Sequence, residues 1–294
     1  MELRVLRYFV TVARMESITK AAEILHVTQP TLSRQLADLE EELGTQLFIR
    51  GKKRISLTED GMLLLRRAEE ILAISDRTVQ EFKDRNNLVG GTISIGSIEA
   101  LTSQQVLSKM ITAFNSEYPQ VSYHIFTGIG DDIKEKLDSG LLEIGILLEP
   151  INYEKYHFIR LQQTERWGIL TRTSSPLAQK DHVRPRDLIG EPLMMSSRIF
   201  VQNKIASWFG DAYADLHIVA TFTLISNVIN LAETGFGTAV CIEGVSKQHY
   251  SKDLCFIPFY PELKSNYVIV WKKHTTMNRT STRFIQFIKH TLKA

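Results

Sequence analysis

Residues 17–58 constrain this chain most, because two short helical patterns, a break and a basic hairpin pattern follow one another in that order. In the first pattern Ala21, Ala22 and Leu25 form a small apolar face on which another helix can pack closely. His26-Val27 then supplies a short break. Two helices joined by so tight a turn are typical of a helix-turn-helix unit.

The second helical pattern begins at Gln29. Thr28 is a favourable N-cap, and Pro30 is tolerated in the first turn, where its missing N–H would have no helical partner. Leucines at i, i+4 and i+7 predict the buried face, which consists of Leu32, Leu36 and Leu39. The opposite face is small and polar at its N-terminal end, as entry into a DNA major groove requires.

Several side chains on and before this helix suit DNA. Gln29 can form a forked pair of hydrogen bonds with adenine and Arg34 with guanine, while Thr31 and Ser33 can bind bases or phosphate. The open N–H groups at both helix starts suit phosphates. The predicted DNA contacts of the two helices are Ser17, Thr19, Thr28, Gln29, Pro30, Thr31, Ser33 and Arg34.

A basic hairpin follows. Arg50, Lys52, Lys53 and Arg54 surround Gly51, and residues 55–57 then alternate like a returning strand. This pattern predicts a wing that contacts the DNA backbone or the adjacent minor groove. The alternative is an ordinary small helical unit with solvated charges. The order of cap, polar face and basic hairpin favours a winged helix-turn-helix, although acidic and basic side chains balance over residues 1–60.

Thr58 and the acidic residues after it predict the start of a long helix that ends before Gly90-Gly91. This linker carries an apolar stripe in heptad rhythm, from which we predict the dimerisation residues Leu65, Ala68, Leu72, Val79 and Phe82. A partner chain would cover the stripe and hold two DNA-binding units at the spacing of half-sites about 34–36 Å apart. The alternative is packing within one subunit.

From Thr92 the pattern changes to alternating strands and helices, which predicts parallel sheets wrapped by helices. Two such units, with crossings near Phe158 and Ser265, predict a hinged α/β fold of two lobes. The predicted domains are residues 1–58 (winged helix-turn-helix), 59–89 (linker) and 90–294 (binding domain). Within the last, lobe I covers about 90–160 and 266–294, and lobe II about 161–265.

A cleft is expected at the carboxyl ends of the strands, where α/β folds bind small molecules. The predicted ligand contacts are Ser97, Ile98, Glu99, Thr127, Gly128, Ile146, Leu148, Ser196, Ser197, Phe200 and Thr223. Each hydroxyl could instead cap a helix. The helix after Ser97 offers N–H groups to an anion, whereas Glu99 at its mouth disfavours one, so the ligand's charge stays open.

These residues resemble the LysR-type transcriptional regulators over the whole chain. The matching positions are Leu3-Arg4, Leu6, Phe9, Val12-Ala13, Ser17, Thr19, Ala21-Ala22, Leu25, Gln29-Pro30, Ser33-Arg34-Gln35, Leu39-Glu40, Leu43-Gly44, Leu47-Phe48, Arg50, Leu57-Thr58-Glu59 and Gly61. The resemblance implies a bacterial regulator with an N-terminal DNA-binding domain, a dimerising linker helix and an effector domain like the periplasmic binding proteins. It also implies that promoter DNA, a small-molecule effector, a homodimer or homotetramer and RNA polymerase are the partners.

The chain departs from the family after Gly235-Phe236-Gly237, where Thr238 to Glu243 replace the usual Leu-Pro pair. Glu243 could alter ligand choice or lie on the surface.

Composition restricts the remaining classes. With 294 residues, a net charge of +2 and no apolar run of membrane length, the chain is expected to be a cytoplasmic protein of several domains, without a signal peptide. Cys241 and Cys255 are expected as reduced thiols, with a redox switch as the alternative. No catalytic or phosphate-binding motif stands out and the eight histidines are dispersed, so neither an enzyme nor a metal or cofactor site is expected.

Each of two other classes fits only part of the chain. An exported solute-binding protein would explain residues 92–294 but needs a signal peptide, which is not expected here, and a ligand-independent DNA-binding protein would explain the DNA-binding unit but not the two lobes.

Overall fold

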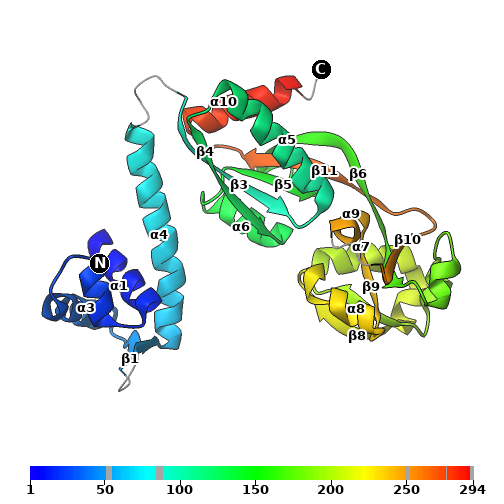
Figure 1. The fold of residues 1–294 in the computed structure, drawn as a ribbon, viewed down its shortest axis with the longest axis horizontal. Coiled ribbons are helices and arrows are strands. Elements are labelled where there is room, and N and C mark those ends of the chain that lie inside the picture. Colours follow the sequence, from blue (N-terminus) through cyan, green and yellow to red (C-terminus); the bar gives the residue numbers. More distant parts are fainter. Residues whose placement is uncertain (51–54, 84–88, 249–251, 276, 292–294) are drawn as a thin grey trace. The chain divides into compact units, whose positions relative to one another are not determined.

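The computed structural model describes residues 1–50, 55–83, 89–248, 252–275 and 277–291 (Figure 1). The chain divides into two compact units, Met1–Leu88 and Val89–Ala294. Among the helices described, none is both long and apolar enough to cross a membrane.

The first unit is a winged helix-turn-helix followed by one long helix, as predicted. Its elements are α1 (Leu3–Met15), α2 (Ile18–Ile24), α3 (Gln29–Leu43), β1 (Phe48–Arg50), β2 (Ile55–Leu57) and α4 (Glu59–Lys83). β1 and β2 pair antiparallel. The side chains of Leu32, Leu36 and Leu39 are each at most 2% exposed, so the apolar face of α3 is the predicted one.

Caps and one carboxylate hold these elements in place. The Ser17 hydroxyl accepts a hydrogen bond from Lys20 N, and the Thr28 hydroxyl accepts one from Thr31 N. Glu40 Oε1 on α3 accepts hydrogen bonds from the backbone N–H groups of residues 47 and 48, at 2.8 and 3.2 Å. The wing is therefore anchored directly to the helix that is predicted to enter the groove.

Helix α4 buries part of its stripe without a partner chain. Ala68 and Leu72 are 0% and 8% exposed because α1 packs along this part of α4. The prediction that a partner must cover the stripe is therefore wrong for these two residues. Leu65 is half-buried against the same core, whereas Val79 and Phe82 are 52% and 61% exposed.

Lobe I of the second unit has β4 (Val121–Gly128), β3 (Gly91–Ile98) and β5 (Ile144–Leu148) in parallel. The strand β11 (Lys264–Lys272) pairs antiparallel with β5 on one side and with the first part of β6 (Tyr156–Arg172) on the other. Its helices are α5 (Leu101–Glu117), α6 (Gly130–Asp138) and α10 (Arg279–Thr291).

Lobe II continues the sheet from β6 through β9 (Thr238–Ile242), β7 (Pro192–Ser196) and β8 (His217–Phe222), with β10 (Leu254–Pro258) on the other side of β6. Its α-helices are α7 (Ile199–Phe209), α8 (Ile229–Thr234) and α9 (Glu243–Gln248). Its 3₁₀ helices are η1 (Pro176–Gln179), η2 (Pro185–Leu188), η3 (Gly210–Asp215) and η4 (Ile225–Asn227).

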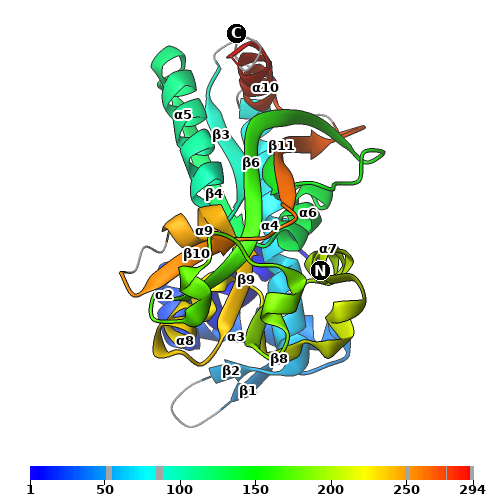
Figure 2. The same cartoon turned by 90° about the vertical axis from the view of Figure 1, so that its right-hand side faces the viewer.

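Two strands connect the lobes, and Figures 1 and 2 show β6 running from one lobe into the other. Phe158 still pairs with Val270 inside lobe I, and pairing with β9 begins only at Trp167, so the first crossing lies later than predicted. Ser265 pairs with Glu165 at the crossing. The predicted parallel pairing holds for β3, β4 and β5 and for β7, β8 and β9. The sheet as a whole is mixed, because β11 pairs antiparallel with β5 and β6, and β6 pairs antiparallel with β9.

Candidate functional site

A cavity of about 120 Å³ lies between the two lobes. Lobe I contributes the carboxyl ends of β3 and β5 and the turn that begins α6. Lobe II contributes the end of β7, the start of α7, the turn after β8 and part of β9. Three of its apolar walls are aromatic, namely Trp167, Phe200 and Phe222. Mostly apolar walls with a few polar groups are typical of small-molecule sites.

Seven of the predicted ligand contacts line this cavity: Ile98, Glu99, Gly128, Leu148, Ser196, Phe200 and Thr223. Three of the others, Ser97, Thr127 and Ile146, do not, because they form a single row across β3, β4 and β5. Successive residues of a strand point to opposite faces. The residue after each member of this row lines the cavity, namely Ile98, Gly128 and Leu147, so each of the three predicted contacts lies one position too early in its strand.

The local environment of the residues outside the cavity agrees with this explanation. Ile146 is fully buried and Ser97 is 1% exposed, with its hydroxyl donating to the Ile98 carbonyl. Thr127 is exposed. Ser197 is exposed as well and donates to the Phe222 carbonyl, so its hydroxyl stabilises the end of β8 and lies outside the cavity.

The prediction missed the residues of the crossing strands. Trp167 and Ser265 both line the cavity, and the Trp167 indole N–H donates to Ser265 Oγ at 2.9 Å. Lys204 Nζ on α7 donates to the same oxygen at 2.7 Å, and burial lowers the pKa of Lys204. The signal that could have identified these residues is topological, because strands that connect two lobes must pass behind the cleft.

Glu149 lines the cavity from lobe I. Burial alone would raise the pKa of its carboxyl, but hydrogen bonds from Arg160, Asn266 and Tyr153 outweigh this effect and the pKa is lowered. Glu149 is therefore ionised at neutral pH, and its charge is neutralised by a cation of its own lobe.

Glu243, the departure from the family pattern, forms two hydrogen bonds with Arg166, at 2.8 and 2.9 Å. It is not one of the cavity residues, although its neighbour Ile242 is. Cys241 also lines the cavity, and complete burial raises the pKa of its thiol. Cys255 is half-buried. Within the part of the chain that the structure describes, no three His, Cys, Asp or Glu side chains group as a metal site requires.

In the first unit, the predicted contacts of α2 and α3 lie on the surface. Thr19, Thr28, Gln29, Pro30, Thr31 and Arg34 are exposed, and Ser17 and Ser33 are half-buried. The hydroxyls of Thr28 and Thr31 lie 2.8 Å apart and hydrogen-bond each other. Arg50 ends β1, but its side chain and all of Lys52, Lys53 and Arg54 lie outside the described residues.

A winged helix-turn-helix joined to a two-lobed α/β domain with an interlobe cavity defines a ligand-responsive transcriptional regulator. Residues 3–62 match the model of the bacterial regulatory helix-turn-helix proteins of the lysR family, and residues 86–293 match the LysR substrate-binding domain. The chain belongs to the LysR family of transcriptional regulators, with a DNA-binding domain and an effector-binding domain.

The chain is similar to other transcriptional regulators over most of its length. It is 29% identical over 244 residues to an uncharacterized HTH-type transcriptional regulator, YvbU, of Bacillus subtilis, which covers 83% of this chain and 82% of that protein. It is 28% identical over 284 residues to the Hca operon transcriptional activator HcaR of Escherichia coli, covering 93% and 92% of the two chains. The crystal structure of CbnR, a LysR family regulator, shares the fold with a TM-score of 0.75 at 20% identity and complete coverage of both chains. The structure of full-length CbnR with its target DNA gives 0.74 at 21% identity, covering 99% and 100% of the chains.

Proposed function

We propose that α3 reads promoter DNA by direct base contacts while the wing binds the backbone, and that a small effector in the interlobe cavity controls the outcome. One observation carries this proposal: a single chain presents both an exposed polar face on α3 and a largely apolar cavity between two lobes. Neither feature alone requires the other, but together they suit a ligand-controlled DNA-binding protein.

The cavity restricts the effector to a small molecule. Its volume of about 120 Å³ approaches that of an engineered apolar cavity of about 150 Å³ that holds benzene. The aromatic walls of Trp167 and Phe200 suit a ring, and the hydroxyls of Ser196 and Thr223 suit a polar substituent. We therefore expect an effector of single-ring size.

The effector part of the proposal is tested by the thermal unfolding of the full chain with a panel of single-ring acids, amides and alcohols. Binding to the native state alone raises the melting temperature. We expect at least one compound to raise it in the parent and to lose this effect in Phe200→Ala. A panel in which no compound acts, or acts equally on the variant, would contradict the assignment of the cavity.

The DNA part is tested with Arg34→Ala, with Lys109→Ala as a control that removes an exposed cation from α5. Loss of a forked base contact should cost about 1–3 kcal/mol and relax the preference at one base pair. We would measure binding to a panel of promoter duplexes with single base changes by fluorescence anisotropy. If Arg34→Ala weakens all duplexes equally, Arg34 contacts phosphate and does not read a base.

We also propose that the chain acts as a homodimer or homotetramer through α4. Phe82 and Val79 are exposed on this helix, as are the apolar side chains of Leu63, Ile71 and Ile74. Phe82→Asp should therefore dissociate the assembly in sedimentation without unfolding the first unit. Leu72→Asp is not a clean test, because Leu72 belongs to the unit's own core.

Three further parts of the proposal follow from promoter binding: the protein acts in the cytoplasm, contacts RNA polymerase and is not an enzyme. The last of these rests on the family, whose members are transcriptional regulators.

A further inference from the structure

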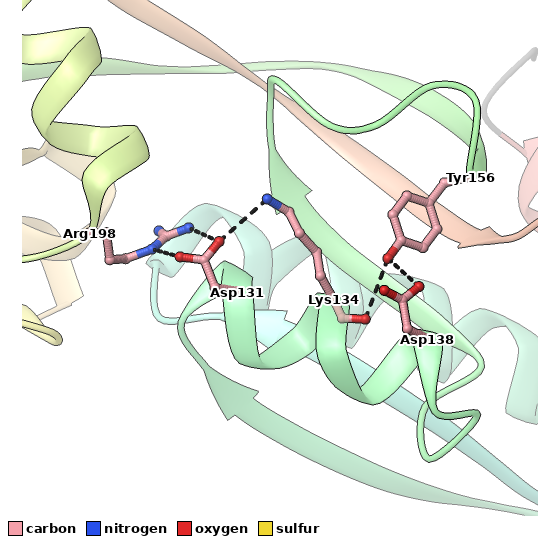
Figure 3. Close-up of polar contacts among 5 residues, drawn as sticks. All are labelled: Asp131, Lys134, Asp138, Tyr156 and Arg198. Carbon is pink, nitrogen blue, oxygen red and sulfur yellow. Dashed lines mark hydrogen bonds and ion pairs between the residues drawn. The ribbon is translucent and has the colours of Figure 1, made fainter.

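One ion pair connects the two lobes beside the cavity. Arg198 lies just before α7 in lobe II, and Asp131 lies in the first turn of α6 in lobe I. Arg198 Nε and Nη2 donate to the two carboxylate oxygens of Asp131 at 2.9 and 3.2 Å, as Figure 3 shows. A pair of parallel hydrogen bonds between guanidinium and carboxylate is stronger and more directional than a single contact.

The pair lies at the boundary of the cavity. Arg198 lines the interlobe cavity and also an outer groove, which contains Asp131 and Ile199. Only 19% of the Arg198 side chain is exposed, against 50% for Asp131. Arg198 is therefore enclosed between the lobes, and its partner faces outward.

The position of Arg198 is not explained by the stability of its own helix. A cation beside a helix N-terminus is unfavourable because that end carries partial positive charge, and Arg198 provides no side-chain cap for α7. Asp131 neutralises this cation and is itself favourably placed in the first turn of α6. The position of Arg198 is therefore explained by its contact with the other lobe and not by its own helix.

Gly130 leaves room for the guanidinium of Arg198. A Cβ atom at this position would lie 2.9 Å from Arg198 Nη2, which is shorter than a normal contact. The chain thus has a residue without a side chain at the point where the guanidinium crosses from one lobe to the other.

We propose that the Arg198–Asp131 pair is an interlobe latch that holds the lobes together on this side of the cavity and so sets the balance between open and closed forms. Only the functional meaning of the latch depends on the proposed effector function. The latch itself can be tested without any effector.

The test is amide hydrogen exchange of the full chain, comparing Asp131→Asn with the parent. The informative segment is the first turn of α7, residues 199–203, because it lies in the lobe that does not carry the substitution. We expect exchange there to accelerate roughly two- to fivefold, as loss of a partly exposed ion pair implies.

The matched control is Asp138→Asn. Asp138 lies on the same helix and accepts a hydrogen bond from the Tyr156 hydroxyl (Figure 3). It also pairs with Lys155, and both partners belong to lobe I. This variant should leave the first turn of α7 unchanged. If Asp131→Asn accelerates exchange in α7 no more than Asp138→Asn does, the latch is refuted.

A second experiment distinguishes the effect of the ion pair from the effect of replacing either side chain. The charge-swapped protein, Asp131→Arg with Arg198→Asp, should return the exchange of α7 toward the parent rate, whereas Arg198→Asp alone should not. If the double variant exchanges as fast as the single one, the latch is refuted as well. If no effector binds the cavity, the effector proposal fails, but these exchange rates still decide whether the latch exists.

Discussion

Replacement of Glu165 by alanine should destabilise the effector-binding domain strongly. Glu165 lies on β6 at the crossing between the lobes and is 2% exposed. Its carboxylate accepts hydrogen bonds from the Tyr267 hydroxyl on β11 at 2.6 Å and from the Gly244 N–H on α9 at 2.8 Å. One buried side chain therefore ties both crossing strands to a helix of lobe II.

The magnitude follows from these two contacts. A hydrogen bond to a charged group contributes about 1.5–3 kcal/mol, and a buried donor that loses its partner retains its desolvation cost. Loss of both contacts should lower the free energy of unfolding by about 3–6 kcal/mol. Glu165→Gln keeps an acceptor in place and should cost less.

The assay is urea unfolding followed by tryptophan fluorescence. All three tryptophans, Trp167, Trp208 and Trp271, lie in the second unit, so the signal reports on this unit and not on the DNA-binding unit. Gln163→Ala, an exposed position on the same strand, is the control. A loss below about 1 kcal/mol for Glu165→Ala would show that water or a rearranged neighbour replaces the carboxylate, and would refute this reasoning.

Three further predictions concern other parts of the molecule. Leu32→Ala should cost the first unit about 2–5 kcal/mol, measured by amide exchange in α3, because Leu32 is fully buried; unchanged exchange would contradict this. Cys255 should react with iodoacetamide before Cys241, since Cys241 is buried and burial raises its pKa further from the neutral range; mass spectrometry of the peptides checks the order. Hydrogen bonds from Arg198 lower the pKa of Asp131, so the pair stabilises the fold above the carboxyl's unfolded pKa of about 3.9, and this stability is lost as pH falls through the lowered value. The urea midpoints of the parent and Asp131→Asn should therefore begin to converge below about pH 5 and continue to converge as the pH falls through the lowered pKa of Asp131, and a constant difference would argue against the assignment.

Much of the fold could be predicted because local signals agree with it. Thr28, Pro30 and the leucines of α3 describe that helix completely, and the strands and helices of both lobes follow from alternation and helical spacing. β10 and α9 were missed, since segments of five and six residues carry too little pattern to distinguish them from loops.

The cavity was predicted less well. The strand ends were placed correctly in the chain, but which residue faces the cavity depends on pairing across β3, β4 and β5, and an error of one residue moves a side chain to the other face. The covering of α4 by α1 was likewise not predictable from periodicity, because an apolar stripe does not indicate whether its partner is in the same chain.

The sequence by itself determined the DNA-binding unit and the two-lobed class of the second domain, since their helices and strands follow from patterns among residues near one another along the chain. Only the tertiary structure decided the partners of distant side chains. Glu165 with Tyr267, Trp167 with Ser265 and Asp131 with Arg198 are pairs separated by 102, 98 and 67 positions. No local pattern specifies such pairs, because they form only when β6 and β11 cross between the lobes and bring the two lobes together.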